Sequence, residues 1–377
     1  MKPFANENRA SQLRAGDWVE VRSREEILAT LDGNSCLEKL PFMPEMFAFC
    51  GKRFRVYKRA HKTCDTVNDY KGRSMNDAVH LEGSRCDGQA HGGCEASCLI
   101  YWKATWLRKI EPPSEVAENS SRILTETVQI EKAGCTELDV WAAARKPLAD
   151  GEEPTYICQV TQVPAATTPL PWWSWKQYLE DYTSGNTRLS AIAKGFIYMF
   201  YYHGLVNLGI GIGPLLTWLY DKFQAVASGT PFPRRTGTVP AGTRTPAASL
   251  NLQRGEFVRV KDFKSIRATC DQSNMNRGLM FDAELVPYCG GTYQVLKRVT
   301  KIVNEKTGKM QQMKGPCIIL DSVVCQARYS ECRLFCPRSI YPYWREIWLE
   351  RVNTARVESP QNAEPQRNRI HAEVSTP

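Results

Sequence analysis

Short runs of alternating apolar and polar residues recur in two parts of the chain, as expected of half-buried β-strands. They form three pairs: 17–22 with 256–261, 52–58 with 292–297, and 78–82 with 317–321. Residues 25–31, which follow the first run, suit a short helix or turn. The pattern therefore predicts two sets of short strands, one near each end of the chain.

The two sets belong to an internal repeat with a constant offset of 239 residues, so that Gly16 falls on Gly255. Between positions 13 and 62, 17 of 50 residues are identical in the two copies without a gap. Self-similarity at a fixed offset indicates a duplicated structural unit. The repeat defines two modules, at 13–111 and 252–352.

Each module opens with short strands after a glycine, a charged residue and an aromatic residue, which resembles a small SH3-like β-barrel. Beyond the last cysteine of each copy, Trp102 and Trp106, and then Trp344 and Trp348, have helical spacing. The sequence thus predicts an α+β protein with two repeated small SH3-like β-barrel modules. Each module is followed by a Cys-rich loop and a short Trp-rich helix, and a partly helical middle region joins them.

Changes in composition predict further segments between and beyond the modules. They are a small β or α+β element at 125–164, a hydrophobic helical segment at 168–226, a linker at 229–250 and a disordered tail at 356–377. Cys135 and Cys158 lie in the first of these, and we expect both to be buried as small apolar residues.

The segment from Phe196 to Tyr220 carries no charge over 25 residues, a length that can cross a bilayer. Its interior glycines and Pro214 would interrupt a simple helix. Three alternatives follow: a buried helical hairpin, which is favoured, a segment that binds a protein partner or a membrane surface, and a transmembrane helix.

Composition adds an unusual cysteine content to this picture. The chain has 14 cysteines but only 5 histidines, and its net charge of +9 arises from 49 basic and 40 acidic residues. That balance permits binding to phosphate or to an anionic membrane without requiring it. No apolar stretch opens the sequence, so we predict a cytoplasmic protein whose thiols are reduced, with association to a membrane as an alternative.

The first module concentrates residues that bind metals. Cys86, His91, Cys94 and Cys98 lie within thirteen residues, and short spacings of this kind suit tetrahedral zinc. Three more candidate ligands lie upstream: His61, Cys64 and His80. Zinc is the predicted metal, with an iron–sulfur cluster as its alternative. A set of reduced buried thiols and a redox disulfide are the alternatives to metal binding.

The second module keeps three of the cysteines, Cys325, Cys332 and Cys336, but has no histidine at the matching positions. Tyr329 falls in the place of His91 when the cysteines are aligned. A metal site there would need Cys289 or Cys317 to complete its ligands. We therefore predict a structural role for the second module.

The stretches HLEGSRCDGQAHGGC in the first copy and CIILDSVVCQARYSECRLFCPR in the second carry a family resemblance. Together with the Trp-rich segments, they are similar to a group of bacterial proteins of unknown activity that have a tandem cysteine-rich module. The resemblance covers nearly the whole chain and implies no reaction, substrate or partner.

These features favour a metal-binding protein with a binding or scaffolding role. One alternative is a metal-dependent enzyme centred on the first module. The other is a nucleic-acid-binding protein that uses a basic stretch with interleaved aromatic residues. Its cations are Lys52, Arg53, Arg55, Lys58, Arg59 and Lys62. Acidic residues elsewhere nearly cancel this charge, so we favour a solvated strand face.

Overall fold

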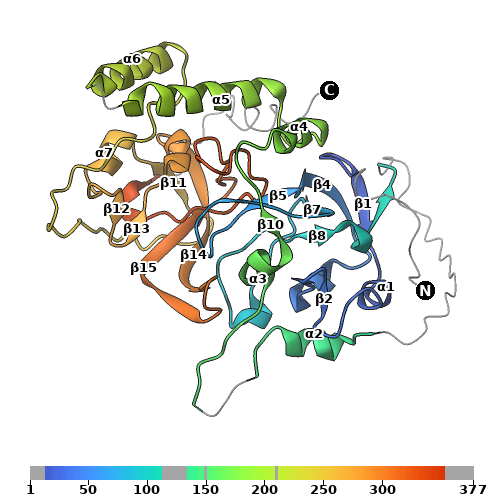
Figure 1. Cartoon of the computed structure of the whole chain (residues 1–377). Coiled ribbons are helices and arrows are strands. Elements are labelled where there is room, and N and C mark those ends of the chain that lie inside the picture. The colour runs from blue at the N-terminus through green and yellow to red at the C-terminus, as the bar shows by residue number, and fades with distance from the viewer. Residues whose placement is uncertain (1–12, 113–133, 148–150, 209–210, 353–377) are drawn as a thin grey trace, which may run out of the picture. The chain divides into compact units, whose positions relative to one another are not determined.

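The structure, a computed structural model, describes residues 13–112, 134–147, 151–208 and 211–352 (Figure 1). The chain divides into two compact units. Unit 1 comprises residues 1–186 together with 303–311, and unit 2 comprises residues 187–302 and 312–377. Helices and several small sheets occur in the chain, so the predicted α+β class is confirmed. The predicted tail at 356–377 lies outside the described residues.

Unit 1 contains a five-stranded antiparallel sheet with the order β8-β7-β4-β1-β9. Its strands are β1 (Trp18–Val21), β4 (Arg53–Arg59), β7 (Ala78–Leu81), β8 (Trp102–Lys103) and β9 (Leu107–Ile110). Val19 and Val21 are fully buried on one face of β1, as the alternation predicts. Two smaller sheets contain β5 (Lys62–Cys64), β6 (Gly72–Ser74) and β10 (Thr168–Pro169), and β2 (Cys36–Leu37) with β3 (Leu40–Pro41).

The helices of unit 1 are short. They are α1 (Arg24–Leu28), α2 (Glu137–Ala143), α3 (Gln159–Ala166) and α4 (Lys176–Thr183), with 3₁₀ turns η2 (Pro44–Phe49), η3 (Gln89–His91) and η4 (Ala104–Trp106). Ser23 begins α1, since its hydroxyl accepts the Glu26 N–H at 3.2 Å while the Glu26 carboxylate accepts the Ser23 N–H at 3.0 Å. This reciprocal pair satisfies two amide groups that the first helical turn leaves without partners.

The Trp-rich segment of unit 1 is not the predicted helix. Trp102 begins β8, Trp106 ends the three-residue turn η4, and β9 follows directly. Both indoles are fully buried, and Trp106 Nε1 donates to Thr30 Oγ1 at 3.0 Å. Strand pairing on both sides of one 3₁₀ turn buries the two rings as well as a helix would, so their spacing did not decide between the two conformations.

Unit 2 contains a four-stranded sheet with the order β15-β14-β11-β16. Its strands are β11 (Phe257–Val260), β14 (Thr292–Val303), β15 (Met310–Leu320) and β16 (Leu349–Arg351), and β12 (Met275–Asn276) pairs with β13 (Leu279–Met280). Its helical elements are α5 (Leu189–Gly204), η5 (Val206–Leu208), α6 (Gly213–Val226), α7 (Phe263–Arg267), η6 (Ala283–Tyr288) and η7 (Glu346–Trp348). The second Trp-rich segment is therefore also a 3₁₀ turn and a strand, and the predicted helix is wrong here too.

The early elements of unit 2 begin 239 residues after those of unit 1. β11 begins at Phe257 and β1 at Trp18, whereas η6 begins at Ala283 and η2 at Pro44. The contact between Trp106 and Thr30 has a counterpart of the same kind, because Trp348 Nε1 donates to the hydroxyl of Thr269 at 2.9 Å. The SH3-like barrel within each module stays a prediction.

The middle region is partly helical. α2 lies in the predicted 125–164 element, α3 begins in it and ends two residues beyond it, and α4 to α6 lie in the predicted 168–226 segment. The unit boundary follows Asn186, so α4 belongs to unit 1 whereas α5 and α6 belong to unit 2. Among the described residues, no helix is both long and apolar enough to cross a membrane.

Candidate metal centre

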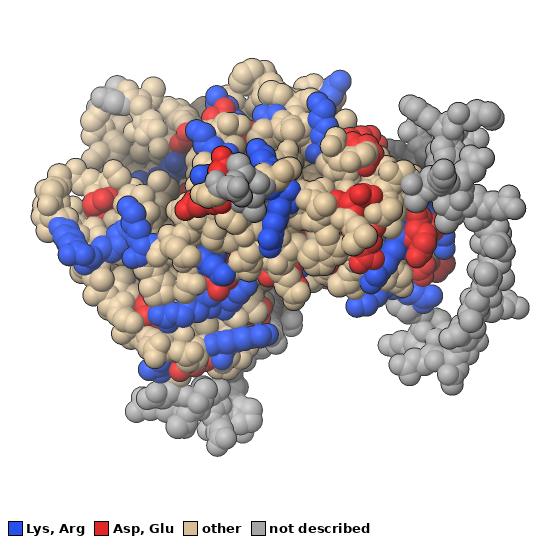
Figure 2. Space-filling view, turned by 90° about the horizontal axis from the view of Figure 1, so that it is seen from below, with Lys and Arg blue, Asp and Glu red and all other residues tan. Residues whose placement is uncertain are grey.

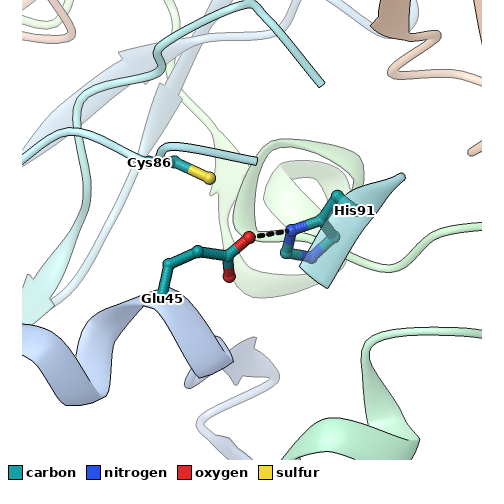
Figure 3. A group of neighbouring side chains, drawn as sticks. All are labelled: Glu45, Cys86 and His91. Atoms are coloured by element: carbon teal, nitrogen blue, oxygen red, sulfur yellow. Dashed lines mark hydrogen bonds and ion pairs between the residues drawn. The ribbon is translucent and has the colours of Figure 1, made fainter. Parts of the chain in front are cut away.

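Three side chains from separate elements of unit 1 converge on one point. Glu45 comes from η2, Cys86 from the loop after β7, and His91 from η3. One potential ligand atom from each side chain lies within 4.8 Å of the others, and Figure 3 shows the Cys86 thiol pointing toward the Glu45–His91 pair. Within the part of the chain that the structure describes, this is the one group of its kind.

Two glycines shape the loop that presents Cys86 and His91. Gly88 has φ +77°, and a side chain there would place its Cβ 2.0 Å from the Cys94 carbonyl oxygen. Gly92 has φ +64°, and its Cβ would lie 2.3 Å from the Tyr156 hydroxyl. Only glycine combines a left-handed conformation with so close an approach, so the loop depends on both positions.

His91 uses both ring nitrogens. Its Nδ1 lies 2.7 Å from Glu45 Oε1, and its Nε2 lies 3.0 Å from the Ile157 carbonyl oxygen. Both partners are oxygen acceptors, so only the doubly protonated ring can donate to both. The side chains of His91 and Glu45 are 2% and 3% exposed. The two residues therefore form a buried ion pair.

The Glu45 carboxylate is only partly satisfied. Its Oε1 accepts from His91 and, at 3.0 Å, from the Ala90 amide, whereas its buried Oε2 has no hydrogen-bond partner among the described residues. Burial raises the pKa of Glu45, but the hydrogen bond and positive charge of His91 outweigh it, so the pKa lies below its ordinary value. An ionised, buried oxygen without a partner is costly unless a cation or water meets it.

In unit 2 the equivalent carboxylate, that of Glu284, accepts hydrogen bonds on both of its oxygens. Glu284, 239 positions after Glu45, accepts from the Arg328 amide at 2.9 Å on Oε2. Its Oε1 accepts from the Tyr329 amide at 2.6 Å and the Ser330 hydroxyl at 3.2 Å. Burial nevertheless prevails over these hydrogen bonds and raises the pKa of Glu284. The structural counterpart of His91 is thus Ser330, not Tyr329 as the cysteine alignment predicted.

One side chain accounts for the difference between the copies. The Gln89 amide, which corresponds to that of Arg328, donates to Asp87 Oδ1 at 3.0 Å instead of to Glu45. The residue 239 positions after Asp87 is Gln326, whose amide group donates to the Tyr288 hydroxyl at 3.1 Å. In unit 1 Asp87 thus accepts the N–H group whose counterpart in unit 2 donates to Glu284 Oε2.

Two other cysteines, Cys98 and Cys158, lie close enough to Cys86 to affect its pKa. Burial raises the pKa of Cys86, and the charges of Glu45, Cys98 and Cys158 raise it further. Burial likewise raises the pKa of Cys158 to about 12, with a contribution from Cys94. The Cys86 and Cys158 thiols are therefore protonated near neutral pH unless a cation stabilises the thiolate.

The other predicted ligands of module 1 have other surroundings. Cys94 Sγ accepts from the Val303 amide at 3.3 Å. His61 Nε2 lies 3.3 Å from Asp181 Oδ1, and His80 Nδ1 lies 2.9 Å from the Ile100 carbonyl oxygen. Cys64 is buried in β5. The structure therefore brings Cys86 and His91 together, and places His61 and His80 in separate polar environments.

The cysteines of module 2 form no metal group with His, Asp or Glu among the residues that the structure describes. Cys325 and Cys332 are half-buried, and Cys336 is buried.

Sequence reasoning missed two residues of the candidate centre. Glu45 lies 41 positions before Cys86, outside any local spacing, but its identity with Glu284 at the repeat offset was a signal that could have identified it. Cys158 is 7% exposed, as the buried interpretation predicts, yet it lies close enough to Cys86 for its charge to raise the pKa of that thiol. No spacing motif marks it.

Compared with known proteins, the chain matches no family model, and no curated protein matches it.

Proposed function

We propose that the protein binds a metal ion, zinc before any other, at Glu45, Cys86 and His91. The observation that carries the proposal is the Glu45 carboxylate, which lies beside a thiol and an imidazole and whose buried Oε2 has no hydrogen-bond partner in the described chain. The matching carboxylate of Glu284 has both oxygens satisfied and neither kind of neighbour in a metal group. The first copy therefore differs from the second by a carboxylate oxygen without a hydrogen-bond donor and by two neighbouring side chains that can bind a cation.

Zinc suits this mixture of ligands because it accepts sulfur, nitrogen and carboxylate oxygen in one tetrahedral site. Binding would displace the proton of Cys86 and the Nδ1 proton that His91 now shares with Glu45. Cys98 and Cys158 lie near enough to Cys86 to raise the pKa of its thiol, and either is a candidate for the fourth ligand. An iron–sulfur cluster, the alternative, has less support because the convergent group contains one thiol rather than four.

The role that fits this centre is structural. A bound metal would tie η2 to the loop from Cys86 to Cys94 and so hold the first module together, which suits a binding or scaffolding protein. Glu45 and His91 are nearly inaccessible, whereas a catalytic metal keeps an open position that substrate can reach. The metal-dependent enzyme therefore remains the second candidate.

The nucleic-acid alternative has less support. Three cations of the basic stretch face carboxylates: Arg53 lies 3.6 Å from Glu20, Arg59 lies 3.0 Å from Glu180, and Lys62 lies 2.5 Å from Asp181. On the face that Figure 2 shows, Lys and Arg side chains lie among Asp and Glu side chains. Charge paired in this way attracts a phosphate backbone weakly.

The repeat supports the rest of the predicted architecture. Elements of both units begin at the same offset and share the Trp-to-Thr hydrogen bond, as two SH3-like modules of one origin would. The similarity to bacterial proteins with a tandem cysteine-rich module belongs to this proposal as well.

Metal stoichiometry tests the proposal. We expect about one zinc per chain after dialysis of the wild-type protein against dilute zinc, and a large loss of bound zinc in Glu45→Gln. Glu284→Gln is the matched control, because it makes the same carboxyl-to-amide change at the equivalent position, and it should retain the metal. Equal zinc content in the two variants would contradict the assignment.

A further inference from the structure

The hairpin formed by α5 and α6 packs against the rest of unit 2 through one face, on which Ile192, Gly195 and Tyr198 of α5 are buried. Tyr198 lies on the buried side of α5, and its ring centroid is 4.9 Å from that of Tyr329. Gly195 faces Phe335 so closely that a Cβ would lie 2.5 Å from its ring. The two helices also contact each other, since the Tyr201 hydroxyl donates to the Leu216 carbonyl oxygen at 2.6 Å. These contacts attach α5 to the rest of unit 2 and α6 to α5, and Figure 1 shows the two helices side by side.

The opposite face of the hairpin is apolar and exposed. Large side chains there are between 47% and 70% exposed: Ile197, Phe200, Leu215, Trp218, Leu219 and Phe223. On α5 Ile197 and Phe200 are three residues apart, and on α6 Leu215, Leu219 and Phe223 follow one another at intervals of four, so on each helix they share one face. Contiguous exposed apolar side chains of this kind mark surfaces that bind another protein, a membrane or a ligand.

The charges of the hairpin are arranged asymmetrically. Asp221 is the single carboxylate between positions 189 and 226. It is engaged on the inner side, where it accepts from the Phe232 amide at 2.7 Å and pairs with Arg235 at 2.5 Å. Lys194 and Lys222 are exposed, and Lys222 Nζ lies 5.7 Å from the centre of the Trp218 ring. The exposed side therefore carries cations without carboxylates.

We propose that this face docks on an anionic membrane surface, with both helices lying parallel to it. α5 has 16 residues and α6 has 14, fewer than the about 20 that span a bilayer. An apolar stripe of Trp, Phe and Leu with lysines beside it is the composition of interfacial helices. Lipid phosphates accept the lysines while the apolar side chains enter the acyl boundary.

A second copy of the chain fits the face less well. Two such faces brought together would bury Lys194 and Lys222 of both copies, and the exposed side has no carboxylate to neutralise them. Charge thus favours a phosphate-bearing partner over self-association.

Sedimentation with lipid vesicles tests the proposal. The full chain should bind vesicles of phosphatidylcholine with phosphatidylserine and bind pure phosphatidylcholine much more weakly. Phe200→Glu and Phe223→Glu should each weaken binding by at least about tenfold, because inserting one Phe contributes a factor of this order. Both positions are exposed, so neither change should prevent folding.

Leu138→Glu is the matched control, because Leu138 is 80% exposed on a helix of unit 1 outside the hairpin. It should leave vesicle binding unchanged. Equal binding by all variants would overturn the proposal, and so would a dimer that Phe200→Glu dissociates while vesicles never retain the protein. The assay needs no bound metal, so its failure would not affect the zinc proposal.

Discussion

His91 donates its Nδ1 proton to Glu45 at 2.7 Å, and both side chains are almost completely buried. The pair joins η2 to η3, two turns separated by about forty residues of sequence. A buried ion pair of this kind contributes little net stability while intact, but removing one partner leaves the other charge without compensation. Under the proposed function, a divalent cation bound by both side chains would take the place of this hydrogen bond.

Removing His91 should therefore strongly destabilise the metal-free protein. We expect His91→Leu to lower the free energy of unfolding by about 3–5 kcal/mol, since Glu45 loses its counter-charge. Urea unfolding in the presence of a chelator measures this change. The control is Ser330→Ala, where Glu284 keeps two amide donors and about 1 kcal/mol should be lost. Similar small losses in both variants would mean that the pair is not charged.

A second buried ion pair involves Lys62 of β5 and Asp181 of α4, whose Nζ and Oδ2 atoms lie 2.5 Å apart. Asp181 is fully buried and also faces His61. Asp181→Asn should lower the free energy of unfolding by about 3–5 kcal/mol, because the buried ammonium group of Lys62 loses the carboxylate that neutralises its charge. Thermal or urea unfolding measures it.

The exposed pair of Arg53 and Glu20 provides the comparison for that variant. Arg53→Met should change the stability by less than about 1 kcal/mol, because solvent screens an exposed pair. A loss in Asp181→Asn no larger than in Arg53→Met would show that the buried cluster does not hold α4 to β5.

The loop conformation can be tested at two glycines that share a left-handed backbone. Gly83 has φ +70° and open space within 4 Å of the position that a Cβ would occupy, whereas at Gly88 the Cβ would overlap the Cys94 carbonyl group. Gly83→Ala should cost about 1–2 kcal/mol from backbone strain alone. Gly88→Ala should cost several kcal/mol more and should also abolish zinc binding. Equal losses of stability would indicate that the loop from Cys86 to Cys94 rearranges freely.

Acid stability should depend on Glu346 in unit 2. Its carboxylate accepts the amides of Leu250 at 2.7 Å and Leu252 at 3.0 Å and pairs with Arg298 at 2.8 Å. Burial raises its pKa, but these donors outweigh that effect and hold the pKa below the ordinary value of 4.5. Because the folded pKa is depressed, the contribution is complete above pH 4.5 and is lost as the pH falls through the folded pKa.

Glu346→Gln should accordingly be less stable than wild type by about 1–3 kcal/mol at pH 7. The difference should shrink as the pH falls below about 4, which unfolding curves across this range would measure. A difference that stays constant with pH would contradict an ionised Glu346 in the folded protein.

The strands of both modules were predictable because alternation of apolar and polar residues reports directly which face is buried. The Trp-rich segments were not, since Trp102 and Trp106 are buried by pairing with residues distant in sequence. Trp102 lies opposite Val79, and Trp106 donates to Thr30. Their helical spacing contained no information about those partners.

The residues of the candidate centre were likewise predictable only in part. Cys86 and His91 share one loop, so their spacing revealed them. Glu45 reaches the loop from a turn far upstream, and only the fold brings it there. The repeat would have helped, because an acid kept at one position in both copies indicates a shared role. In both copies the glutamate accepts backbone amides of the cysteine-bearing loop. In the first copy alone, one oxygen of that glutamate, Glu45 Oε2, has no hydrogen-bond partner among the described residues.

Cobalt binding tests the central claim most directly, because cobalt(II) replaces zinc and reports its ligands by absorption. The wild-type protein should show a thiolate-to-metal charge-transfer band and the visible bands of a tetrahedral site at one equivalent. Cys86→Ser should lose the charge-transfer band or much of its intensity, whereas Cys325→Ser, at the equivalent position of the second module, should leave the spectrum unchanged. An identical spectrum in Cys86→Ser and wild type, or no cobalt spectrum in wild type, would contradict a metal centre at Glu45, Cys86 and His91.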